Sequence, residues 1–295
     1  MTLDDTTPFS DPGFRLDLAT RHLLEFNLFI LELLSCDWCS ADSPLRLRDD
    51  LSLDQVGSTR FFDQARRFLR LMVENDGAPL TPGGWLKRAY VARLLEHLEW
   101  PRGFIAPLRS CFRKIDESDV KPLKIINSVC QLGNLVRKRR GRLYVPRTVL
   151  PLLEDDRAGQ LYHRLFLTFF RKFNLDNLWG FAQTPLLQDT IAILLWRLTI
   201  VAREWVPLHR IPDELLLGPV WNEIIAQEEK FQLDLLFHRV LEPLAWFGLL
   251  ECTPELREIE FDITKDLRDL RLRKRPLFDQ FIQFQPFSSL PIEAS

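Results

Sequence analysis

The sequence has little glycine, few cysteines and no apolar run long enough to cross a membrane. Its 295 residues contain 12 glycines against 19 prolines, which disfavours glycine-turned β-sandwiches and indicates short helices ended by proline. The 5 cysteines are spread along the chain, so they predict a reducing compartment instead of a disulfide framework. The apolar stretch 23–34 is too short for a bilayer and contains Glu25, Asn27 and Glu32.

The remaining composition is that of a folded protein, at 46% hydrophobic and 27% charged residues. Residues 1–17 are acidic, which is the wrong charge for the start of a secretory signal. We therefore expect a cytoplasmic protein that has no membrane partner.

Charge is distributed unevenly, although the formal net charge is only −2. Residues 1–59 contain eleven acidic and four basic side chains, and residues 204–269 contain fifteen acidic and six basic ones. Residues 121–150 contain eight basic side chains and no acidic one. Such segregation carries information about binding partners and little about the fold.

Helical spacing of apolar residues dominates the chain and predicts a mainly α fold. One example is the segment 59–73, where three arginines (Arg66, Arg67, Arg70) are expected on the outer face. The tryptophans lie among apolar neighbours and are expected in the core. The helices predicted in this way cover residues 14–35, 59–73, 85–98, 120–132, 161–177, 190–203 and 231–247.

Two stretches interrupt the helices with the pattern of a small β-hairpin. In the first, a helix ends near Gly133, and the turn RKRRGR separates two short apolar segments within residues 135–145. In the second, Gly248 precedes a strand at 249–250, acidic residues follow, and residues 259–263 are the expected return strand. Thr148 and Thr264 each follow their hairpin and start a helix, so a degenerate duplication is plausible.

The order of helix, helix, hairpin and helix resembles the winged-helix superfamily, which implies that each hairpin is a wing. The blocks LTPGGWLKRAYVARLLEHLEW and LFLTFFRKFNLDNLW are similar to blocks in bacterial proteins without an assigned activity, some of them plasmid-borne. We predict five segments: an N-terminal helical segment (1–78), a first winged unit with a basic wing (79–158), a helical connector (159–188), an acidic second winged unit (189–275) and a phenylalanine-rich tail (276–295).

The basic stretch of the first unit predicts duplex DNA binding. In a winged helix, one helix can enter the major groove while the wing contacts phosphates, and basic side chains at a wing contribute salt-sensitive affinity. A solvated hairpin tip or a docking site for an acidic protein would explain the same charges. The expected nucleic-acid-binding residues are Lys121, Lys124, Asn127, Gln131, Arg137, Lys138, Arg139, Arg140, Arg142 and Arg147.

The second unit and the tail predict protein contacts. The helix of the second unit offers Asp234, His238, Arg239 and Glu242, and its wing offers Glu251, Glu255, Glu258 and Glu260, most of which would repel phosphate. Four tail phenylalanines would form an apolar patch in water, so they must dock on the chain's own core, which we favour, on a second copy of the chain or on another protein. These are Phe278, Phe281, Phe284 and Phe287.

No spacing in the sequence is typical of a catalytic, metal or cofactor site. Cys36 and Cys39 have half of a zinc-site pattern, but no second pair accompanies them. We therefore expect no cofactor and no metal, and a non-enzymatic protein. The leading hypothesis is a nucleic-acid-binding protein in a regulatory or defence-related complex. The alternative is a protein-interaction scaffold built from two winged-helix units.

Overall fold

The computed structural model describes residues 28–40, 42–100, 104–178, 183–226, 229–254 and 267–285. Within them the protein is mainly α-helical, as the periodicity predicted, and the strands form three small antiparallel sheets. Among these residues, no helix combines the length and apolarity needed to cross a membrane. The buried side chains form one hydrophobic cluster that extends from Leu33 to Ile282.

The helices and strands have the following bounds. The α-helices are α2 (Leu53–Val56), α3 (Arg60–Glu74), α4 (Arg88–His97), α5 (Ile105–Cys111), α6 (Lys121–Leu132), α7 (Ala158–Arg171), α8 (Pro185–Asp189), α9 (Ile191–Val201), α10 (Ile211–Leu215), α11 (Gly218–Ile225), α12 (Glu229–Leu236), α13 (Glu242–Trp246) and α15 (Pro276–Phe281). The strands are β1 (Leu45–Leu47), β2 (Ala78–Pro79), β3 (Arg137–Arg139), β4 (Arg142–Tyr144), β5 (Val206–Pro207), β6 (Leu250–Thr253), β7 (Arg271–Lys274) and β8 (Ile282–Phe284).

The first half of the chain builds one group of helices around a three-stranded sheet. Its element order is α3, β2, α4, α5, α6, β3 and β4, and the sheet order is β2-β4-β3. Helix α3 contacts both α6 and β4, so it packs with these elements although it precedes residue 79. The predicted boundary at residue 79 stays a prediction.

The second half repeats this order with different connections. Helix α9 is followed by β5, α10, α11, α12, a single π-helical turn (Phe237–Leu241), α13, β6 and β7, with the sheet order β5-β7-β6. The strand that pairs with β6 is β7, at Arg271–Lys274, a segment for which the sequence predicted no strand. The expected return strand 259–263 lies outside the described residues, and residues 267–269 form a 3₁₀ turn.

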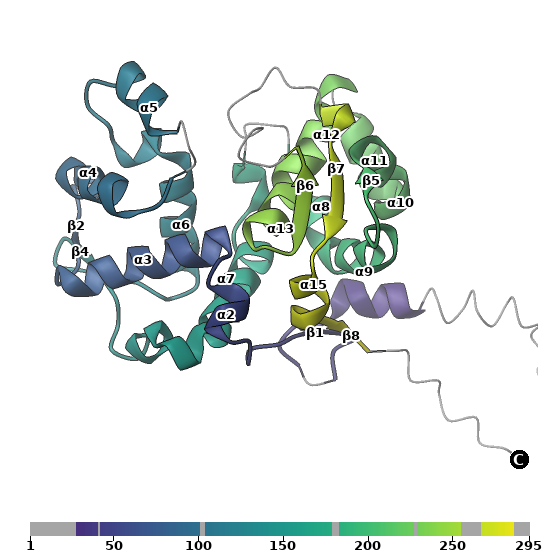
Figure 1. Ribbon diagram of the computed structural model, residues 1–295, viewed down its shortest axis with the longest axis horizontal. Helices are drawn as coiled ribbons and strands as arrows, with labels where there is room; N and C mark the ends of the chain where they lie inside the picture. Colours follow the sequence, from purple (N-terminus) through teal and green to yellow (C-terminus); the bar gives the residue numbers. More distant parts are fainter. Residues whose placement is uncertain are drawn as a thin grey trace, which may run out of the picture.

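Helix α7 runs between the two groups (Figure 1). The ring of its residue Phe169 contacts Phe61 of α3 and Phe247 at the end of α13. The hydroxyl of Tyr162 donates a hydrogen bond to the carbonyl oxygen of Phe247, at 2.6 Å. Phe61 from α3 stacks on Phe247 with ring centroids 4.8 Å apart. Tightly packed aromatic pairs of this kind stabilise beyond the area that they bury, so this cluster joins the two halves.

The tail packs back onto the same aromatic cluster. Phe278 and Phe281 of α15 are fully buried, and the ring of Phe281 lies 4.8 Å from Tyr162. Phe284 is half-buried in β8, which pairs antiparallel with β1 (Figure 1). Phe287 lies outside the described residues. The rings of Phe278 and Phe281 are therefore core residues in this structure and are not exposed to a protein partner.

Candidate nucleic-acid interface

The hairpin of β3 and β4, which the sequence predicted as a wing and for which we keep that name, is tight, and its tip carries the basic residues. Strands β3 and β4 pair with Arg139 opposite Arg142, so only Arg140 and Gly141 form the turn. Their φ angles are 49° and 70°, the left-handed pair required by a two-residue type I′ turn. The side chains of Arg137, Lys138, Arg139 and Arg140 are all exposed.

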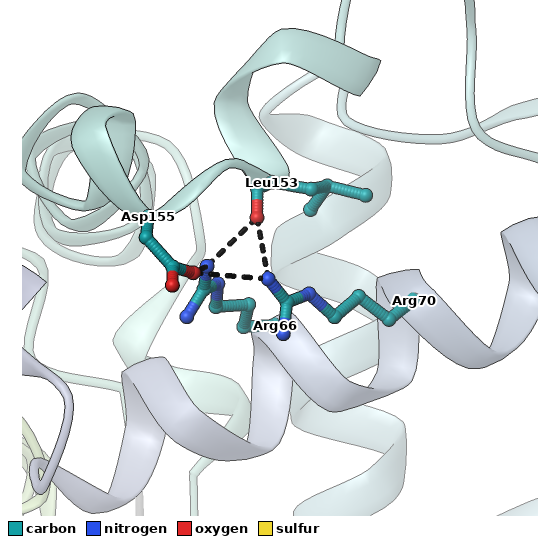
Figure 2. A network of polar contacts seen from close by, with 4 residues as sticks. All are labelled: Arg66, Arg70, Leu153 and Asp155. Atoms are coloured by element: carbon teal, nitrogen blue, oxygen red, sulfur yellow. Dashed lines mark hydrogen bonds and ion pairs between the residues drawn. The ribbon is translucent and has the colours of Figure 1, made fainter.

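Two arginines of α3 fix the segment that follows the wing. Figure 2 shows Arg66 and Arg70 converging on the carbonyl oxygen of Leu153 and on the carboxylate of Asp155. The Leu153 oxygen accepts hydrogen bonds of 2.8 Å and 2.9 Å from them, and the two guanidinium groups hold the pKa of Asp155 below its usual value. The expectation that Arg66 faces outward is wrong, because it is only 7% exposed and serves this internal contact.

Arg142 anchors the wing instead of extending from it. Its Nη2 atom donates to the carbonyl oxygens of Asn75 and Gly77, at 2.9 Å each. These two residues follow the end of α3, where backbone carbonyl groups have no partner within the helix and can accept a hydrogen bond from a side chain. A phosphate contact through Nη2 would replace both hydrogen bonds, so we assign Arg142 to holding the hairpin in place.

Helix α6 presents fewer polar side chains to solvent than its sequence suggested. Asn127 is 3% exposed, and its Nδ2 donates to Oε1 of the buried Glu117 at 2.6 Å. The Nε2 of Gln131 donates to Oδ1 of Asn127 at 3.0 Å. Asn127 is therefore an internal residue, because α6 packs against α3 and α7 and buries a wide face. Lys124 is the basic residue that α6 exposes fully.

Glu117 also positions a loop that the sequence did not identify as part of the site. Its Oε2 accepts a hydrogen bond from the backbone N–H of Leu86 at 2.7 Å. The preceding residue, Trp85, is 47% exposed, and Lys124 Nζ lies 5.9 Å from the centroid of its ring. Trp85 is therefore not the core residue that its apolar neighbours predicted.

The same loop approaches the wing. A β-carbon placed at Gly84 would lie 3.3 Å from Nζ of Lys138, so this lysine lies beside the loop. The loop thus lies beside Lys124 of α6 and Lys138 of the hairpin. We use the name basic patch for the exposed tryptophan of the loop and the exposed cations of α6 and the hairpin apart from the anchoring Arg142, which are Trp85, Lys124, Arg137, Lys138, Arg139 and Arg140.

Two further basic residues predicted from sequence lie apart from this definition. Arg147 is exposed in the segment after β4. Lys121, at the start of α6, is half-buried, and desolvation lowers its pKa to about 8, against an opposing effect of the Glu242 charge and a smaller lowering from Lys124. Lys121 therefore does not present a solvated ammonium group like that of Lys124.

The corresponding sheet of the second half also carries basic residues, since β7 contains Arg271, Arg273 and Lys274, but Lys274 forms an ion pair with Asp279 at 2.7 Å. Glu251 of β6 forms an ion pair with Arg273 of β7 at 2.6 Å, and the guanidinium of Arg273 lies over the ring of Trp205. Arg239 and Glu242, which the sequence assigned to the helix of the second unit, are both fully buried. Glu255, Glu258 and Glu260 lie outside the described residues.

The described residues hold no group of three or more His, Cys, Asp or Glu side chains that would bind a metal ion. Of the cysteine pair, Cys36 is buried and Cys39 is exposed. Burial raises the pKa of the Cys36 thiol, which disfavours the thiolate form that a metal ligand needs.

Comparison with known proteins gives one match. A family model described as the Y4jL N-terminal domain matches residues 58–158, about a third of the chain. This segment begins just before α3, ends at the start of α7 and contains the whole basic patch. It holds twenty basic and eleven acidic side chains, in a chain with a net charge of −2. The search of curated proteins and the search of solved structures found no match.

Proposed function

We propose that residues 58–158 form a winged-helix-like unit that binds duplex nucleic acid through the basic patch. The observation that carries this proposal is the gathering of five exposed cations and one exposed tryptophan on the wing, α6 and the loop at Gly84–Trp85. The element order of this half, with the four α-helices α3 to α6 and a three-stranded sheet, supports the winged-helix part of the proposal. The excess of basic side chains in the segment supports the nucleic-acid part.

The geometry favours contact with the sugar–phosphate backbone over the reading of bases. Base recognition from a helix needs amide or guanidinium side chains free to enter the major groove. Asn127 is buried and Gln131 is hydrogen-bonded to it, which leaves Lys124 as the main polar contact of α6. We therefore propose binding with little sequence preference and strong salt dependence.

The test is duplex DNA binding across a salt series from 50 to 300 mM. We expect the quadruple change of Arg137, Lys138, Arg139 and Arg140 to alanine to weaken binding. The logarithmic salt slope should fall by roughly 3 to 4, because each phosphate contact contributes about 0.9. An unchanged slope, or no binding by the parent protein at 50 mM salt, would contradict the proposal.

A matched control separates position from net charge. Arg93, Arg109, Arg113 and Lys114 are exposed cations of the same segment that lie outside the basic patch. Changing these four to alanine removes the same total charge. If the basic patch is the interface, this variant keeps most of the affinity and slope of the parent.

The alternative is a protein-interaction scaffold in which the patch docks an acidic protein. The tail gives this alternative less support than its sequence did, since Phe278 and Phe281 are buried within the chain. Duplex binding that a molar excess of polyglutamate does not displace would favour nucleic acid. For the cellular setting we propose a bacterial cytoplasm and a regulatory or defence-related complex, and the five free cysteines support a reducing compartment.

A further inference from the structure

Trp85 is the uncharged member of the basic patch, and its side chain is exposed to solvent. A tryptophan ring is a large apolar surface that proteins bury for the most part. The two residues before it, Gly83 and Gly84, have no side chains to cover the ring, and a β-carbon at Gly83 would lie 3.5 Å from its Cδ1 atom. The ring therefore lies at the surface with area available to a ligand.

The backbone around Trp85 is fixed on both sides. The backbone N–H of Thr81 donates to the carbonyl oxygen of Trp85 at 2.7 Å, and the N–H of Trp85 donates to Oγ1 of Thr81 at 3.2 Å. The next residue, Leu86, is buried, and its N–H is held by Glu117. Because a tryptophan side chain has only two torsions, a ring on this backbone loses little conformational entropy when a ligand stacks on it.

Two lysines from different elements lie near this ring. Nζ of Lys124 in α6 lies over the ring, and Nζ of Lys138 in β3 lies beside Gly84. A nucleotide has matching parts, since its base is a flat ring and its phosphate is an anion close to that base. An aromatic ring among basic side chains is the combination by which proteins hold single-stranded nucleic acid.

A base within a duplex is covered on both faces by its neighbours in the stack, whereas an unpaired base can present a face to an aromatic side chain. We propose that the basic patch binds the junction between a duplex and an unpaired strand, with the wing on the duplex backbone and Trp85 stacked on an unpaired base. This inference rests on the proposed duplex binding and adds to it the class of nucleic acid. Stacking accepts every base, so it agrees with binding of little sequence preference.

The test uses three DNA probes that share one duplex. In the first, a long strand paired with a shorter complement leaves thymine tails of both polarities. In the second, abasic sites replace the tail thymines, and the third probe is blunt. Both kinds of tail carry the same phosphates, so their comparison separates stacking from charge. We expect the full chain to bind the thymine-tailed probe about tenfold more tightly than the abasic-tailed one, a ratio equivalent to 1.4 kcal/mol.

Variants assign this preference to one ring. Trp85→Leu removes the aromatic ring and keeps an apolar side chain, so it should bind the two tailed probes equally, and Trp85→Phe should keep part of the preference. Trp205→Leu is the matched control, because Trp205 is also exposed and has the Arg273 guanidinium over its ring, but belongs to the second half. This control should bind all three probes like the parent. A preference that survives Trp85→Leu would refute the assignment to Trp85.

The probes distinguish failure of this inference from failure of the proposed function. If the parent binds the blunt duplex but binds the two tailed probes equally, the inference is overturned and the duplex proposal stands. If the parent binds none of the probes, both are overturned. A free thymine strand bound as tightly as the tailed duplex would also overturn the inference, since it would show that the junction is not recognised.

Discussion

Arg140 occupies a backbone position that suits asparagine or glycine better than arginine. Its φ of 49° lies in the left-handed region, where most L-residues are disfavoured by roughly 1 kcal/mol and asparagine is tolerated. The wing therefore retains a basic side chain at a local conformational cost, which is consistent with a role for that charge in binding.

The variant Arg140→Asn separates this cost from the charge. We expect the free energy of unfolding to rise by up to about 1 kcal/mol, while the salt slope of DNA binding falls by about 0.9. Urea denaturation and the salt series measure the two effects. If stability falls and binding is unchanged, the arginine acts in folding and not at the interface.

The half-buried Lys121 makes the stability of the protein depend on pH. Its pKa is about 8 in the folded protein, against an ordinary value of 10.5. Between these two values the unfolded chain binds more protons, so this residue makes stability rise as pH increases from 8 to 10.5. The rise is absent below pH 8, where both states are protonated.

The variant Lys121→Met removes this contribution and keeps the apolar stem. We expect it to be more stable than the parent at pH 7 and to lose that advantage progressively by pH 10. The measurement is the difference between the urea midpoints of the two proteins at each pH. A difference independent of pH would show that the lysine is protonated equally in both states.

The sequence predicted the candidate site correctly only where the exposure of a side chain does not depend on a partner elsewhere in the chain. The run RKRRGR identified the exposed wing because four adjacent charges at a tight turn cannot all be buried. Periodicity did not predict the burial of Asn127 or Arg66, because each depends on a partner distant in sequence, Glu117 for Asn127 and Leu153 for Arg66. Trp85 was missed since its apolar neighbours resemble those of a core residue.

At the scale of elements, Gly159 determines how closely α7 approaches the loop between β1 and α2. A β-carbon at this position would lie 2.4 Å from the backbone nitrogen of Leu51 and 2.5 Å from the carbonyl oxygen of Asp49. Neither backbone atom moves as easily as the end of a flexible side chain. The helix therefore packs directly on this loop only because residue 159 has no side chain.

Because of this contact, we expect a change of Gly159 to alanine to lower the free energy of unfolding, whereas Gly→Ala in a helix usually raises it. Gly→Ala within a helix normally stabilises by up to about 1 kcal/mol, but for Gly159→Ala we expect a net loss of about 1 to 3 kcal/mol from overpacking. Gly218→Ala in α11 is the control, since a β-carbon there would meet nothing within 4 Å. Chemical denaturation of both variants would measure these changes, and a stabilised Gly159→Ala protein would refute the close contact.

A helix or strand could be predicted from sequence when the residue pattern that specifies it lies within that element. The helix expected at 59–73 is α3, at Arg60–Glu74, because its apolar residues repeat along a single face. The pairing of β1 with β8 was not predicted, because each strand has three residues, and an apolar–polar–apolar alternation over three residues is too short to identify a strand. Their partnership depends on the rest of the chain bringing them together.

At the scale of the molecule, the tail is part of the core. We expect deletion of residues 277–295 to destabilise the whole protein by more than the roughly 3 to 5 kcal/mol typical of removing one buried phenylalanine, because it removes Phe278, Phe281 and the partner of β1. Urea denaturation measures the loss. Deletion of residues 286–295 alone is the control and keeps α15 and β8.

Measuring the molecular mass of the protein in solution tests the other hypothesis, that the tail docks on a partner. If the long deletion leaves stability unchanged but reduces the oligomeric mass or releases a bound protein, the tail docks on a partner. Unchanged stability together with unchanged mass would contradict both hypotheses.

The pairing of β1 with β8 also sets the order of events during synthesis. Leu47 lies opposite Ile282, so β1 leaves the ribosome about 235 residues before its partner. At roughly 5 to 20 residues per second, the strand waits on the order of ten to fifty seconds with its hydrogen-bonding edge unpaired. An unpaired strand edge is a template for wrong association, so the nascent chain is vulnerable to aggregation through β1 until β8 emerges.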